Sequence, residues 1–170
     1  TFKEAALAAG PYLGGALHLS VAAGITSDSM ATWLGTQRIV RAMPNTPALV
    51  GLGMTGLYAR PGASASDRAQ VEAVVATTGA HVWLQQENDL DTVTALSGSG
   101  PAYVFYFLEA MREAGMQMGL DAATAQKLAI GTFVGASALA AASDDPPEVL
   151  RERVTSKGGT TFAALTSMES

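Results

Sequence analysis

The chain of 170 residues contains no cysteine and only two histidines, His18 and His81. The absence of thiols excludes a disulfide framework, a zinc–thiolate site and a thiol nucleophile, and it permits a cytoplasmic location. The two histidines lie far apart beside apolar segments, with no spacing typical of metal ligands. We therefore expect a protein that works without a bound metal.

Basic residues are also scarce, and long apolar runs are absent. Ten Lys and Arg against fifteen Asp and Glu give a net charge of -5, which argues against a nucleic-acid partner. The longest apolar stretch, residues 128–142, is interrupted by Gly131 and Gly135 and is shorter than the roughly 20 residues that a bilayer demands. A helix that is apolar on nearly all sides must be buried, so we predict that a second copy of the chain covers it.

Two kinds of pattern follow each other along the chain. Strand-like segments alternate with short helical segments up to residue 86, which predicts an α/β unit with a mostly parallel sheet. After residue 86 only helical patterns recur, which predicts an all-α domain over residues 87–170. The expected strands are 17–23, 38–43, 53–59 and 81–84; the expected helices include 26–34, one capped by Ser66 and Asp67, 90–96, 101–118, 121–142 and 146–154.

Both ends of the chain look cut. Residues 1–9 have the pattern of the tail of an amphipathic helix, and residues 161–170 stop inside another helical pattern. There is no initiator methionine and no pattern of a secretory signal. We expect a fragment of a longer protein.

The segment Met43-Pro44-Asn45-Thr46-Pro47 follows a predicted strand at its carboxyl end. Open α/β sheets bind their ligands at that edge. The two prolines fix the turn and remove N–H donors, which leaves the Asn45 amide and the Thr46 hydroxyl to face a ligand. A plain turn explains the same residues equally well.

The segment Ser97-Gly98-Ser99-Gly100-Pro101 precedes a predicted helix, and Pro101 suits the first helical turn. Its serine hydroxyls could serve a ligand or the unpaired N–H groups of the helix. A glycine-permitted kink between two packed helices is the alternative.

The segment Ser156-Lys157-Gly158-Gly159-Thr160-Thr161 also opens a helix. Two glycines let the backbone bend, and free N–H groups at a helix start favour an anion such as a substrate carboxylate. Taken alone, a flexible loop with a threonine cap is the simpler interpretation.

No pair of side chains suited to acid–base or nucleophilic catalysis is evident in the sequence. There is no Ser/His/Asp order and no isolated pair of carboxylates. This absence favours a reaction in which a cofactor carries the difficult step and the protein supplies position.

Taken together and in order, residues 41–48, 96–103 and 154–161, which contain these three segments, resemble the pyrroline-5-carboxylate reductase family, and the resemblance covers essentially the whole chain. It implies the C-terminal part of a Rossmann-type dinucleotide-binding domain over residues 1–86. A helical dimerisation and substrate domain would follow over residues 87–170. The implied reaction is hydride transfer from NADPH or NADH to the C=N carbon of 1-pyrroline-5-carboxylate, giving L-proline in a cytoplasmic homodimer or larger assembly.

The resemblance also implies roles for residues that match its motifs. Thr161 would hydrogen-bond the ring nitrogen of the cyclic imino acid. The other roles are a substrate carboxylate site at Ser156, Gly159 and Thr160, a pocket wall at Ser97, Gly98, Ser99 and Gly100, and a nicotinamide border at Met43, Pro44 and Asn45.

One departure separates the chain from this family. The family begins with a strand, a Gly-x-Gly-x-x-Gly turn and a helix that hold the pyrophosphate, and none of these is present. We therefore expect the chain alone to lack full cofactor binding, and its NAD or NADP preference is not encoded here.

Two other functions remain open on the sequence alone. A related β-hydroxyacid dehydrogenase would need an acid–base lysine in the helical domain, where only Lys127 and Lys157 are available. A non-catalytic dimerisation module would keep the helices and lack the nucleotide site.

Overall fold

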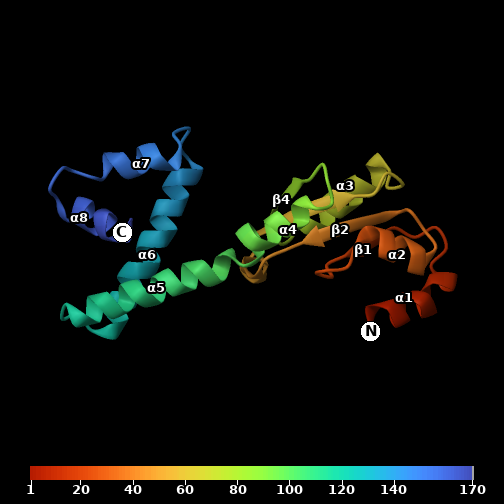
Figure 1. The fold of residues 1–170 in the computed structure, drawn as a ribbon, viewed down its shortest axis with the longest axis horizontal. Coiled ribbons are helices and arrows are strands. Elements are labelled where there is room, and N and C mark those ends of the chain that lie inside the picture. The colour runs from red at the N-terminus through yellow and green to blue at the C-terminus, as the bar shows by residue number, and fades with distance from the viewer. Residues whose placement is uncertain (170) are drawn as a thin grey trace. The chain divides into compact units, whose positions relative to one another are not determined.

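The computed structural model describes residues 1–169, which fall into two compact units (Figure 1). The first unit is Thr1–Phe105, and the second begins at Tyr106, within α5. The α-helices are α1 (Phe2–Ala9), α2 (Ser27–Leu34), α3 (Ala65–Val75), α4 (Asp89–Val93), α5 (Gly100–Gln117), α6 (Ala122–Ala141), α7 (Pro147–Arg153) and α8 (Thr160–Met168). Three shorter turns are the 3-10 helices η1 (Gly10–Tyr12) and η2 (Thr46–Val50) and the π-helix η3 (Thr94–Gly98).

The first unit is built on one four-stranded sheet in the order β1-β2-β3-β4. The strands are β1 (His18–Ser20), β2 (Ile39–Met43), β3 (Gly53–Ala59) and β4 (Gly79–Trp83). The pairs β1–β2 and β3–β4 are parallel, as predicted for a mostly parallel sheet. The pair β2–β3 is antiparallel, because the short η2 turn joins these strands without a crossover helix.

Sequence signals account for both ends of α2 and for the start of α3. The Thr26 hydroxyl accepts from the Ser29 N–H at the start of α2, and Gly35 ends this helix in the left-handed conformation at φ 69°. The cap of α3 is Ser64, two residues earlier than predicted, and it forms a capping box with Asp67.

The core of this unit lies between the sheet and α3. Val40 and Ala42 of β2 and Leu57 of β3 pack with Val71 and Val75 of the helix. A second cluster joins α2 to the first residue of β2.

One ion pair anchors α3 beside the end of this core. The Arg38 guanidinium donates to Asp67, with 2.6 Å between Nη2 and Oδ1. This contact and the bond from the Ser64 N–H lower the pKa of Asp67 well below its usual range.

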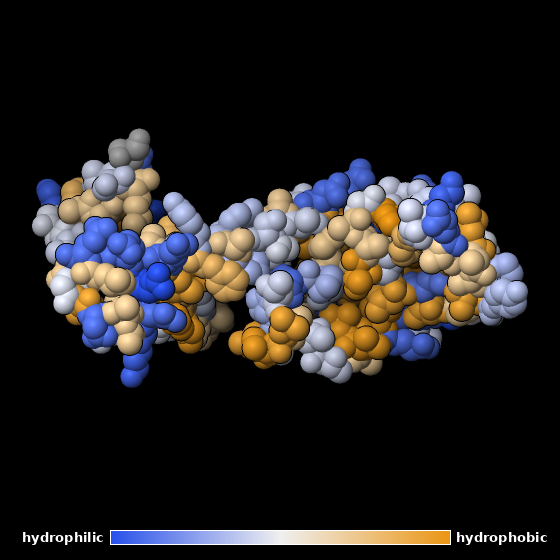
Figure 2. Space-filling model, turned by 90° about the horizontal axis from the view of Figure 1, so that it is seen from below, coloured by the Kyte–Doolittle hydropathy of each residue, from blue (hydrophilic) through white to orange (hydrophobic). Residues whose placement is uncertain are grey.

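The second unit is helical and leaves much of its apolar surface open. From Tyr106 to residue 169, the buried residues are Gly115, Ala125 and Ala129. Leu128, Val134 and Leu139 on α6 are exposed. Figure 2 shows apolar residues at the surface of the described chain. Within the described residues, no helix is long and apolar enough to cross a membrane.

Candidate functional site

The loop that follows β2 is tied by one asparagine to two other segments. Met43, Pro44 and Asn45 are all half-buried. The Asn45 Nδ2 donates to the carbonyl oxygen and to the hydroxyl of Ser97, each at 3.2 Å. The Asn45 Oδ1 accepts from the N–H of Met54 in β3 at 2.9 Å. Two of the three segments singled out in the sequence are therefore in direct contact.

The serine–glycine segment lies at the end of a π-turn. The Ser99 N–H donates to the Thr94 carbonyl at 2.8 Å, five residues back. The Thr94 hydroxyl donates to the Leu90 carbonyl, and the Tyr103 hydroxyl donates to the Ala95 carbonyl. Turns of this kind occur often at functional sites, because they turn carbonyl and N–H groups out of the helical ladder.

A glycine in β3 lets this segment approach the sheet. A Cβ at Gly56 would lie 2.8 Å from Cγ1 and 3.1 Å from Cγ2 of Val93. Only a residue without a side chain admits Val93 at this distance. The close contact places α4, and the π-turn after it, against the sheet.

A charged anchor that sequence reasoning missed holds the same region. Arg41 of β2 is 6% exposed, and its Nη1 lies 2.8 Å from Oε1 of Glu87, just before α4. The other contacts of Glu87 are with Ser27, whose N–H and hydroxyl both donate to the carboxylate at 2.5 Å.

These contacts set the ionisation of Glu87. Burial disfavours its charged form, but the hydrogen bonds from Ser27 and Arg41 outweigh burial and leave the pKa below its usual value. The only signal in the sequence for this ion pair was Arg41, which lies between apolar residues of the strand.

The third segment, in the second unit, forms a tight turn that leads into α8. The Gly159 N–H donates to the Ser156 carbonyl at 3.0 Å, and Gly158 has φ 75°. A Cβ at Gly159 would lie 2.6 Å from the Ser156 hydroxyl, so a larger residue there would displace this hydroxyl. Gly159, and not a threonine, is the N-cap of α8, and no side chain caps the helix among the described residues. Its first N–H groups are thus left for an anion.

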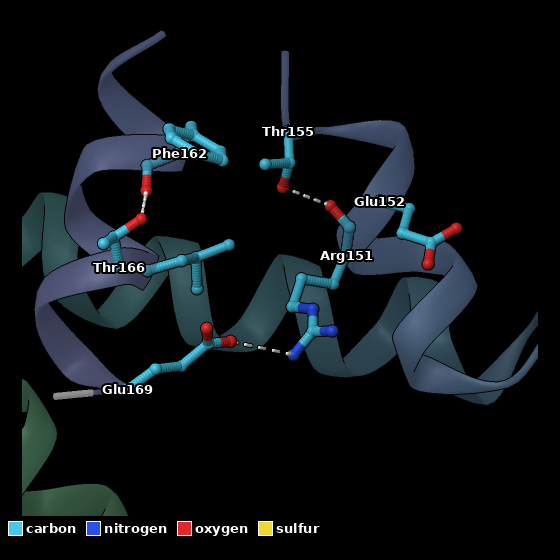
Figure 3. A pocket seen from close by; sticks show the side chains of 7 residues that line it. Arg151, Glu152, Thr155, Phe162, Thr166 and Glu169 are labelled. Atoms are coloured by element: carbon cyan, nitrogen blue, oxygen red, sulfur yellow. Dashed lines mark hydrogen bonds and ion pairs between the residues drawn. The ribbon is translucent and has the colours of Figure 1, made fainter. Parts of the chain in front are cut away.

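The two threonines of this segment differ in exposure: Thr160 is exposed and Thr161 is half-buried. A cavity of about 170 Å³ lies between α7 and α8, next to the turn (Figure 3). Inside it Arg151 faces Glu169 at 3.9 Å. The Thr155 hydroxyl donates to the Arg151 carbonyl in α7, and the Thr166 hydroxyl donates to the Phe162 carbonyl in α8. None of the predicted substrate-binding residues lines this cavity.

No group of three or more His, Cys, Asp or Glu side chains in the described part of the chain could hold a metal ion. The polar groups gathered in the first unit are amides, hydroxyls and a paired carboxylate. Such groups hold and orient a ligand, and they supply no strong acid or base.

The fold defines a class of protein: part of a Rossmann-type α/β domain followed by a helical domain. The model of the pyrroline-5-carboxylate reductase dimerisation domain matches residues 87–170. Among curated relatives, the pyrroline-5-carboxylate reductase of Pseudomonas aeruginosa is 46% identical over 154 residues, which are 90% of this chain and 56% of the relative. That of Pasteurella multocida is 44% identical over 88% of this chain and 55% of the relative.

Solved structures agree with these relatives. A pyrroline-5-carboxylate reductase from Coxiella burnetii superimposes with a TM-score of 0.91 and 38% identity, over 98% of this chain and 63% of that one. The Plasmodium falciparum reductase, solved with NADP bound, gives a TM-score of 0.90 and 32% identity, over 98% and 67%. The chain belongs to the pyrroline-5-carboxylate reductase family, and it spans little more than half the length of these two curated relatives.

Proposed function

We propose that the protein containing this chain reduces 1-pyrroline-5-carboxylate to L-proline, with hydride from NADPH or NADH, as the last step of proline biosynthesis. The observation that carries the proposal is the contact between Asn45 and Ser97, which joins the loop after β2 to the serine–glycine segment. The names of the relatives support the same activity.

The loop after β2 suits the nicotinamide end of the cofactor. Met43 and Pro44 are half-buried, Pro44 has no N–H, and the two residues offer an apolar border to a flat ring. The backbone of Asn45 completes this border. When bound, the cofactor supplies the hydride, and these residues hold the ring and keep water away from it.

The start of α8 suits the substrate carboxylate. Ser156, Gly159 and Thr160 lie at the positive end of a nine-residue helix, whose first N–H groups are capped by no side chain of the described residues. The hydroxyl of Thr161, a half-buried residue, binds the ring nitrogen of the imine. Gly98, Ser99 and Gly100 line the pocket together with Ser97. A cyclic imine is readily protonated in water, so the protein mainly provides orientation.

The protein works as a cytoplasmic homodimer, and dimers assemble further. The support is the dimerisation model over residues 87–170 and the exposed apolar surface of α6. A helix of this composition needs a second chain to bury it. We also propose that the dinucleotide-binding domain ends at residue 86 and that the helical domain begins at residue 87.

The test is the loss of reduced-nicotinamide absorbance when 1-pyrroline-5-carboxylate is added to the full-length gene product, with NADH and NADPH separately. Turnover is expected with at least one cofactor, and the comparison gives the preference. A folded protein that is inactive with both would contradict the proposal. Activity on a β-hydroxyacid would then select the related dehydrogenase, and inactivity there too would select a non-catalytic module.

A further inference from the structure

The Ser97 carbonyl has lost its ordinary helical partner. In an α-helix this oxygen would accept from the N–H of the residue four positions on, which here is Pro101. Proline has no N–H. The next donor along the chain, the Ala102 N–H, already donates to the Ser99 carbonyl at 2.9 Å. The Ser97 carbonyl therefore needs a donor from elsewhere in the molecule.

Asn45 supplies that donor. Its Nδ2 lies 3.2 Å from the Ser97 carbonyl oxygen, across 52 residues of sequence. The orientation of the amide is fixed by its partners, since a carbonyl oxygen only accepts and the Met54 N–H only donates. The asparagine thus joins the end of β2, the start of β3 and the π-turn η3.

We infer that Asn45 is a positioning residue, whose side chain replaces the hydrogen bond that Pro101 cannot make and so holds the serine–glycine turn in place. The inference rests on the proposed function and deepens it. The side-chain amide of Asn45 is used in hydrogen bonds within the protein, so only the backbone of Asn45 borders the cofactor. The Ser97 hydroxyl accepts from the same Nδ2, which leaves its proton for a ligand.

The substitution Asn45→Asp separates these bonds. A carboxylate of the same shape still accepts from the Met54 N–H but cannot donate to Ser97. Leaving the carbonyl without a donor should speed hydrogen exchange of the Ser99 N–H, which reports the π-turn, by roughly 10-fold. The matched control is Asn88→Asp, at the only other asparagine in the chain, which is exposed and makes no cap bond.

Pro101→Ala provides the decisive comparison, because it restores an N–H at the position that Ser97 would ordinarily use. In that background Asn45→Asp should speed exchange at Ser99 by less than about 3-fold. An equal acceleration with and without Pro101 would overturn the inference, as would no acceleration in either. If Asn45→Asp fails to fold, hydrogen exchange in the unaltered chain still tests the inference. Its Asn45 side-chain amide protons should exchange at least about 10-fold more slowly than those of Asn88, and equal rates would overturn the inference.

The functional readout uses the full-length gene product. There Asn45→Asp should lower kcat, and adding Pro101→Ala should restore part of the loss. Failure of that restoration, in a protein that is otherwise active, would contradict the positioning role. The exchange experiment needs neither substrate nor cofactor. An unaltered protein that is inactive would therefore contradict the reductase proposal, and the inference on Asn45 would still be tested by hydrogen exchange.

Discussion

Single atoms decide how closely the segments of the site approach one another. At Gly56 the missing side chain makes room for Val93, and at Gly159 it makes room for the Ser156 hydroxyl. Val93 is branched at Cβ and has few rotamers, so it cannot turn away from an added methyl group. A larger residue at Gly56 would therefore disturb the contact with Val93, whereas at Gly159 the Ser156 hydroxyl can turn aside.

Gly56→Ala should destabilise the first unit by about 1–3 kcal/mol, because the added methyl group overpacks the contact with Val93. Urea unfolding followed by tryptophan fluorescence measures this, since Trp33 and Trp83 both lie in the first unit. Gly14→Ala is the control, because a Cβ there meets nothing within 4 Å. Equal losses for the two variants would show that the contact is not tight.

Thr161→Val should lower kcat with the imine by roughly 10- to 100-fold and leave the KM for the cofactor nearly unchanged, because only the proposed hydrogen bond to the substrate would be lost. Steady-state kinetics of the full-length gene product would measure both constants. Thr166→Val is the matched control in the same helix, where the hydroxyl donates to the Phe162 carbonyl. Unaltered turnover in Thr161→Val would remove this residue from the site.

At the scale of elements, one carboxylate joins the start of α2 to β2 and to the segment before α4. Glu87 accepts from the Ser27 N–H and hydroxyl at the first residue of α2 and from Arg41 in β2. A negative charge at a helix start is favourable in itself. The contact therefore stabilises three elements through one ionised group.

Glu87→Gln should cost about 1.5–3 kcal/mol near neutral pH, because the charged hydrogen bonds are lost. The folded-state pKa of Glu87 is lowered, so its contribution is present above about pH 4.3 and disappears as the pH falls through the folded value. The difference in unfolding free energy between the unaltered chain and the variant should shrink accordingly below that pH. Glu152→Gln, at an exposed residue of α7, is the control. A difference that stays constant with pH would contradict the assignment.

Local signals in the sequence predict where helices and strands lie better than they predict which of these elements are in contact. The Thr26 cap, the Gly35 stop and the bounds of β3 follow from residues next to them, and the structure confirms each. Asn45 and Ser97 are 52 residues apart, and Arg41 and Glu87 are 46 apart. Such pairs depend on how the strands are ordered, which no local pattern encodes. The expected β1 was too long for the same reason, since only three residues find a partner in β2.

At the scale of the whole molecule, the second unit has more apolar surface than its own helices bury. Leu128, Val134 and Leu139 of α6 stand exposed, and a Cβ at Gly131 or Gly135 would meet nothing within 4 Å. Exposed apolar surface of this extent indicates a protein–protein contact. The proposed dimer accounts for it.

Gly135→Asp should convert the dimer to a monomer at micromolar concentrations, because it buries an unpaired charge in the contact. Sedimentation velocity measures the change. Ala122→Asp adds the same charge in the first turn of α6, where a helix tolerates an acid, and should leave the dimer intact. A dimer that survives Gly135→Asp would show that this face is not the one buried.

The π-turn η3 also sets the rotational phase of the helix after it. A π-turn contains one residue more than an α-turn, and each residue of a helix advances the side chains by about 100°. In an ordinary helix one extra residue would therefore rotate every later side chain by that angle, whereas the wider turn of η3 absorbs the residue and leaves the phase of α5 nearly unaltered. If the same residues were wound as an α-helix, the aromatic rings of α5 would point in new directions, although no contact of theirs had been altered: Tyr103, Phe105, Tyr106 and Phe107. The π-turn itself therefore fixes the directions in which these rings point.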